Sequence, residues 1–233
     1  MTFTPLMIGL SLIAILYGAY MALAQEDLKK LIAYSSVSHM GFVTLGIFAF
    51  NVPGIEGAIL QMVNHGITTG ALFLCVGAIY ERTHSRMIAD NRGLAGPMPR
   101  YATVLVIFAL SSLGLPGTNS FVGEFLVLVG TFFWNKVAAV AASLGVILAA
   151  VYLLWMVQRI VFGPPEDAAG KLFDLTGREM ATFVPLVLLV FWIGVYPHPL
   201  LTTMHRSVNG LVERLDQQQL SKAGGHQGYS KTI

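Results

Sequence analysis

The sequence predicts an all-α polytopic membrane protein with six transmembrane helices, the fourth of them discontinuous. Hydrophobic residues make up 55% of the chain and charged residues only 11%, whereas soluble domains carry about 25% charged residues. The mean hydropathy of +0.68 is correspondingly high. In a soluble fold of 233 residues much of this apolar surface would face water, so the composition favours lipid surroundings.

Six apolar segments account for the predicted spans, because each is near the ~20 residues that cross a bilayer as a helix. The fourth is too long for one straight span, and Gly114, Pro116 and Gly117 lie near its middle. Proline removes a backbone donor and glycine loosens the chain, so we expect a helix break there. The predicted spans, within a membrane domain at 1–199, are 5–24, 31–50, 55–80, 101–132, 137–162 and 180–196.

Lysine and arginine residues gather in alternate loops, and this asymmetry sets the predicted orientation. The short loops on one side hold only Lys136. We therefore expect the basic loops to face the cytoplasm of a bacterial cell and both termini to lie on the periplasmic side of the inner membrane. The basic loops hold Lys29, Lys30, Arg82, Arg86, Arg92, Arg100, Arg159, Lys171 and Arg178.

The last part of the chain, 200–233, has a different composition. Its first half, 200–215, shows a weak amphipathic pattern that favours a helix on the membrane surface. Residues 217–233 are polar, with Gln-Gln-Gln and Gly-Gly runs, and we predict that they are disordered.

Glu124 is the main candidate functional residue, because it is the only acid clearly inside a predicted span. A charge at the bilayer centre costs at least ~2.5–3.5 kcal/mol on insertion scales. Burial favours the protonated form of a carboxyl group and so allows proton exchange near neutral pH. Discontinuous helices often line ion sites near the membrane midplane. Glu124 therefore has two interpretations: a proton carrier, which we favour, and a structural carboxylate bonded to another helix.

Two histidines lie near the middle of predicted spans, and histidine titrates near neutral pH. His65 shares one helix face with Gln61 and Thr68, at i−4 and i+3. Such a polar stripe either holds a water chain or packs against another helix. His39 follows three serines, which we expect to bond to carbonyls of their own helix, and a relay role and a structural role for His39 remain open.

Other polar residues have simpler interpretations. Lys136 ends a loop beside aromatic residues and is either an interfacial anchor or a proton-exit group. Cys75 is the single cysteine, so the chain alone offers neither a disulfide nor a cysteine-ligated cluster. The spacing of the histidines predicts no metal site, and neither a dinucleotide loop nor a basic stripe for nucleic acid is present in the sequence. The chain is therefore not expected to perform redox catalysis by itself.

Four sequence blocks carry a resemblance to a known family. They are DLKKLIAYSSVSHMG at 27–41, GAILQMVNHG at 57–66, YERTHSR at 80–86 and LGLPGTNSFVGEF at 113–125. In this order they resemble the antiporter-like proton-translocating subunits of respiratory NADH–quinone oxidoreductase (complex I), and within them the subunit M branch.

The resemblance implies roles for individual residues. Glu124 falls on the family's broken-helix proton site, and His39 and His65 fall on its paired relay histidines. The first five spans would form one proton half-channel of the second inverted repeat, with the sixth span beside them. The family's first repeat is not in this sequence, so we expect a fragment or one half of a split subunit. NADH, FMN, iron–sulfur clusters and quinone would be bound by other subunits, and other membrane-arm subunits and lipid would be the partners.

Three alternatives remain at this stage. A subunit of a multisubunit sodium/proton antiporter and a membrane subunit of a proton-pumping hydrogenase share the family's ancestry. A scaffold that transports nothing is the alternative of another class. The polar residues inside the spans argue against a scaffold, because a scaffold need not bear the cost of inserting them.

Overall fold

The computed structural model describes residues 3–164 and 172–227, and every regular element in that part of the chain is a helix. Five of these helices are long and apolar enough to cross a membrane. The eight helices are α1 (Thr4–Leu23), α2 (Leu28–Phe48), α3 (Val52–Thr83), α4 (Pro99–Ser112), α5 (Asn119–Trp134), α6 (Lys136–Ile160), α7 (Gly177–Val195) and α8 (His198–Gln227).

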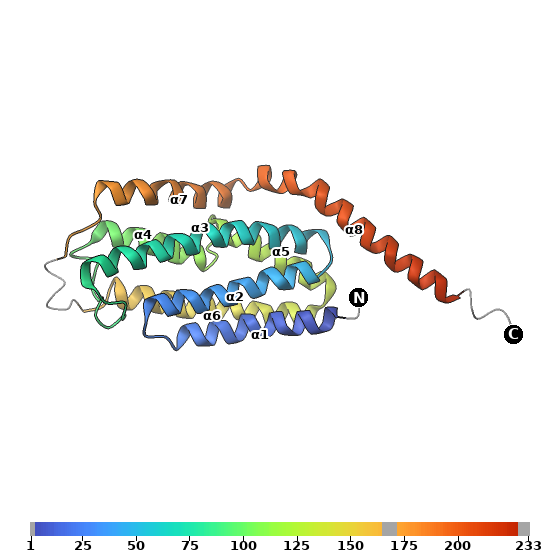
Figure 1. Ribbon diagram of the computed structural model, residues 1–233, viewed down its shortest axis with the longest axis horizontal. Coiled ribbons are helices and arrows are strands. Elements are labelled where there is room, and N and C mark those ends of the chain that lie inside the picture. Colours follow the sequence, from blue (N-terminus) through green and yellow to red (C-terminus); the bar gives the residue numbers. More distant parts are fainter. Residues whose placement is uncertain (1–2, 165–171, 228–233) are drawn as a thin grey trace.

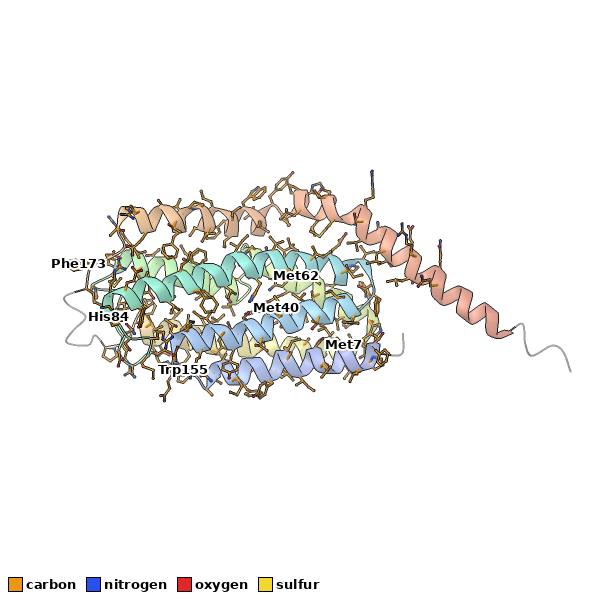
Figure 2. All side chains as sticks on the ribbon, viewed as in Figure 1. Met7, Met40, Met62, His84, Trp155 and Phe173 are labelled. Carbon is orange, nitrogen blue, oxygen red and sulfur yellow. The ribbon has the colours of Figure 1, made fainter. Side chains whose placement is uncertain are left out.

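The first seven helices run roughly along the long axis of the molecule, with α4 and α5 one after the other, and α8 leaves the bundle at an angle (Figure 1). The shorter apolar helices α4 and α5 together occupy the predicted fourth span, with the interruption at 113–118. The start of α1 and the start of α8 lie at the same end. In Figure 2, Met7 marks this end, while His84, Trp155 and Phe173 mark the opposite end.

Polar residues at helix starts explain why several helices begin where they do. The side chain of Asp27 accepts hydrogen bonds from the backbone of Lys29 and Lys30, at the start of α2. Asn51 and Asn135 cap α3 and α6 in the same way. Such caps satisfy the backbone donors that a helix leaves unpaired in its first turn.

Glycines bring the backbones of α2, α3 and α5 into close contact. A Cβ added to Gly130 would lie 2.4 Å from the backbone nitrogen of Gly54, and one added to Gly46 would lie 2.5 Å from the carbonyl oxygen of Gly54. Small residues at helix interfaces in membranes permit this approach. The three helices therefore form a tightly packed centre.

The buried apolar residues form two clusters at opposite ends of the bundle. The larger contains Leu31 of α2 and Leu72 of α3, and the smaller contains Phe42 of α2 and Ala58 of α3. Along both helices the buried residues between the clusters are mostly polar. We call this middle part of the bundle the polar layer; its buried or partly buried members are Ser35, Ser36, His39, Gln61, Asn64, His65, Thr68, Thr69, Ser111, Ser112, Asn119, Glu124 and Tyr152.

The prediction of disorder from Gln217 onward is wrong for 217–227, because α8 continues as a helix through Gln227. Residues 217–223 are mainly Gln, Leu, Lys and Ala, which have good helix propensity and can extend an existing helix. Residues 228–233 lie outside the described part, as does Lys171. The surface position predicted for 200–215 stays a prediction.

Candidate functional site

The centre of the polar layer is a carboxylate–imidazole pair between α2 and α5. His39 Nδ1 lies 2.7 Å from Glu124 Oε1. Gln61 Nε2 on α3 donates to the same oxygen at 3.0 Å. His39 and Glu124 are only 2% and 4% exposed. Three helices therefore place one acid, one base and one amide together away from solvent.

The interruption between α4 and α5 lies beside the other oxygen of this carboxyl group. Gly114 and Gly117 adopt φ angles of +79° and +92°, in the left-handed region that glycine enters without strain. A Cβ added to Gly114 would lie 3.2 Å from Glu124 Oε2. The break thus brings the backbone beside the carboxyl group.

Hydrogen bonds that Asn119 accepts join the two sides of the break. Ser111 Oγ, at the end of α4, donates to Asn119 Oδ1 at 2.6 Å. Thr68 Oγ1 of α3 donates to the same atom at 3.3 Å, and Asn64 Nδ2 donates to the Asn119 carbonyl at 2.7 Å. Backbone groups freed by a helix break inside a membrane need partners of this kind.

A second row of polar groups continues from the other side of the His39 ring. Its Nε2 lies 3.3 Å from both Ser112 Oγ and Tyr152 OH. The ring centroids of His39 and His65 are 5.7 Å apart. His65 is less buried than His39, and its Nε2 lies 2.7 Å from Ser36 Oγ.

Two oxygens in the layer have no hydrogen-bond partner among the described residues: Gln61 Oε1 and Asn64 Oδ1. Buried polar atoms in proteins are nearly always bonded to protein or to ordered water. The layer therefore contains more acceptor capacity than its own donors use.

The structure gathers some predicted site residues and separates others. Glu124, His39, His65, Gln61 and Thr68 are all in the polar layer. Lys136 is not: it is exposed at the start of α6, with Nζ 5.6 Å from the centroid of the Phe132 ring. Cys75 is buried in the larger apolar cluster. In the described part of the chain, no group of three or more His, Cys, Asp or Glu residues is placed to hold a metal ion.

Sequence reasoning missed five members of the site: Ser36, Ser111, Ser112, Asn119 and Tyr152. Ser36 was expected to bond to its own helix, but its hydroxyl contacts His65 on α3. Tyr152 carried a usable signal, because it interrupts the apolar middle of α6. Asn119 also carried one, because it is the first residue of α5 after the break.

A family of known membrane proteins matches this chain. The family described as NADH:quinone oxidoreductase/Mrp antiporter, TM, matches residues 1–150. The chain belongs to this family. The match covers every member of the polar layer except Tyr152, and the fold is that of an antiporter-like integral membrane protein.

Individual relatives agree with this assignment. The chain is 51% identical to "NADH-quinone oxidoreductase subunit M" of Rhodobacter capsulatus over 213 residues, which are 91% of this chain and 42% of that protein. It is 49% identical to "NADH-ubiquinone oxidoreductase chain 4" of Marchantia polymorpha over 212 residues, 91% of this chain and 43% of that one. The chain therefore spans less than half the length of these relatives.

Solved structures show the same fold. A chain of respiratory complex I from Thermus thermophilus with bound NADH superposes with a TM-score of 0.87 at 34% identity, over 91% of this chain and 45% of that chain. A chain of the Mrp complex from Dietzia sp. DQ12-45-1b superposes with a TM-score of 0.80 at 20% identity, over 91% and 48%. The second likeness concerns the fold alone.

Proposed function

We propose that this chain is a proton-translocating membrane-arm subunit of NADH–quinone oxidoreductase, where it helps to couple electron transfer from NADH to quinone to proton movement across the membrane. The observation that carries the proposal is the buried pair of Glu124 and His39, 2.7 Å apart in a polar layer between two apolar clusters. Family membership and the relatives named subunit M support it.

The pair can share one proton between two groups, with Gln61 fixing the position of the carboxyl oxygen. From His39 the proton would pass to His65, whose ring is 5.7 Å away between centroids. One ring rotation or one bridging water spans this gap. Gln61 Oε1 and Asn64 Oδ1, which have free acceptor capacity, are suitable positions for such waters.

The electron-transfer groups belong to other chains in this proposal. NADH, FMN, the iron–sulfur clusters and quinone would bind to other subunits, and this chain would supply only proton transfer. Its partners would be other membrane-arm subunits, including antiporter-like ones, together with lipid. The exposed apolar side chains of α1, α6 and α7 suit lipid or neighbouring helices.

The test is Glu124→Gln in the assembled complex. Glutamine keeps the size and polarity of the side chain but cannot carry the proton, so we expect proton pumping to fall at least tenfold while assembly is retained. Glu124→Asp is the matched control: it keeps the titratable group one methylene further back and should be milder. Normal pumping by an assembled Glu124→Gln complex would refute the proposal. Replacing sodium with choline should leave the rate unchanged, whereas a sodium/proton antiporter would lose activity.

We also propose that the chain lies in a bacterial inner membrane with both termini on the periplasmic side. Helices α2, α5 and α7 finish at the end of the bundle where α1 starts, whereas α1, α3 and α6 finish at the opposite end. Single cysteines at Arg86 and Lys136 should therefore be labelled from the cytoplasm and the periplasm, respectively. The native Cys75 is fully buried and gives little background. Labelling of both positions from one side would contradict this orientation.

A further inference from the structure

Two arginines from different elements lie near each other at the end of the bundle that holds the basic loops. Arg92 lies in the connection between α3 and α4, and Arg159 lies in the last turn of α6. Three of their N–H groups are buried without an acceptor among the described residues: Arg92 Nε, Arg159 Nε and Arg159 Nη2. Arginine N–H groups are strong donors of charge-assisted bonds, so three unpaired ones in one place need an explanation.

The backbone holds the two arginines together. Leu94 N donates to the carbonyl of Ile160 at 2.9 Å, and Ala95 N donates to that of Val161 at 3.1 Å. A Cβ added to Gly163 would lie 3.3 Å from Arg92 Cβ and would collide with the Arg159 carbonyl oxygen. The connection is thus fixed to the end of α6, and Arg92 cannot move far from Arg159 without breaking these bonds.

The charges at this place are only partly balanced by the described residues. The two guanidinium groups repel each other, and Glu26 attracts Arg159. Glu26 forms no ion pair within 4.0 Å with either arginine among the described residues. By contrast, Arg82 at the same end has a full partner, because Glu179 accepts two hydrogen bonds of 2.8 Å from it.

We propose that Arg92 and Arg159 form a binding site for one oxyanion of the phosphate or phosphodiester class. The planar guanidinium fork matches the oxygens of a phosphate group, and two forks supply enough donors to surround it. Both residues are partly exposed, so a ligand can approach the guanidinium groups, and their three covered N–H groups would turn toward it on binding. This inference does not depend on proton transfer in the polar layer.

The position of the site favours the headgroup of an anionic phospholipid as the source of the phosphate. The Arg159 guanidinium carbon lies 3.6 Å from the centroid of the Trp155 ring, and this tryptophan is 40% exposed. Tryptophans of membrane helices lie at the level of the lipid headgroups. Free inorganic phosphate has the same chemistry and is the other source to be distinguished.

The experiment uses the full chain in a neutral detergent, with short-chain phosphatidylglycerol and inorganic phosphate as separate probes. Dissociation constants and thermal midpoints would be measured for the natural chain and for Arg92→Gln, Arg159→Gln and the double variant. Arg178→Gln is the matched control, an exposed arginine at the same end. Phosphatidylglycerol should raise the midpoint of the natural chain and the control. Each removed site arginine should weaken binding about tenfold or more, as expected for one charge-assisted bond.

The ligand-free proteins give a second readout. Because the two cations repel each other, Arg92→Gln should not lower the ligand-free midpoint, whereas the loss of a purely structural arginine would lower it. If phosphatidylglycerol binds and inorganic phosphate does not, the ligand is a lipid headgroup. If millimolar phosphate displaces phosphatidylglycerol, the ligand is the free ion. Both outcomes support the oxyanion site. Equal binding of both probes to the natural chain and to the double variant would overturn the proposal. If the double variant does not fold, Arg92→Gln alone decides, since Arg92 lies outside the helices.

Discussion

The hydrogen bond between Ser111 and Asn119 should measurably stabilise the broken span. It joins the last turn of α4 to the first residue of α5 over a distance of 2.6 Å, and Asn119 Oδ1 also accepts from Thr68 at 3.3 Å. Side-chain hydrogen bonds inside membranes contribute about 0.6 kcal/mol on average and about 1.7 at most. Asn119→Ala loses both bonds and also the 3.4 Å bond that Asn119 Nδ2 donates to the Asn64 carbonyl, so we expect its free energy of unfolding to fall by about 1.5–2.5 kcal/mol.

A double-mutant cycle with Ser111→Ala isolates the single bond. The short distance predicts a coupling energy of about 1 kcal/mol between Ser111 and Asn119. This coupling energy should stay below the maximum, because Thr68 Oγ1 lies 3.1 Å from Ser111 Oγ. The hydroxyls of Ser111 and Thr68 can therefore bond to each other when Asn119 is removed.

The assay is reversible unfolding of the purified chain in mixed micelles by increasing dodecyl sulfate. Gln217→Ala, an exposed amide on α8, is the control and should change stability by less than about 0.5 kcal/mol. A coupling energy near zero, with all variants folded, would refute the idea that this bond joins the two sides of the break.

Three further outcomes are expected. Gly123→Ala places a Cβ 3.0 Å from the Cα and Cβ of the glutamine that bonds to the buried acid, so it should cost about 1–3 kcal/mol by overpacking and slow proton transfer. Gly9→Ala, with open space around it, should cost nothing in the same unfolding assay. His65→Ala should slow proton transfer in the assembled complex more than Leu74→Ala at an exposed apolar site; equal rates would leave only a packing role. Glu56→Gln weakens its 2.6 Å contact to α8, so limited proteolysis within 206–215 should become faster, and an unchanged rate would mean that other contacts hold α8.

The sequence predicted those features of the fold that depend on local signals. Run length located the membrane helices, because the bilayer sets the length of an apolar helix. The positive φ angles of Gly114 and Gly117 and the proline between them are local properties too, so the break was predictable. Glu124, His39 and His65 stood out one by one, because a titratable residue inside an apolar run is unusual.

The contacts among these residues could not be predicted in the same way. His39 and Glu124 are 85 residues apart, and their contact depends on how α2 and α5 are rotated against each other. Ser36 shows the limit clearly: its local environment suggested a bond within its own helix, but helix packing put it against His65. The Arg92–Arg159 pair is likewise visible only once the α3–α4 connection is placed beside α6.

The close glycine contacts among α2, α3 and α5 limit how the centre of the bundle can move. If α5 slid by one residue along α3, a residue with a Cβ would take the place of Gly130. A Cβ at that place would lie 2.4 Å from Gly54 N, which is too close. Helix shifts take microseconds to milliseconds, whereas side-chain rotation can be far faster. We therefore expect the Glu124 carboxyl group to change hydrogen-bond partners by rotation of its side chain, while the helix backbones stay in place. The conformational change that accompanies proton transfer would then be confined to one side chain.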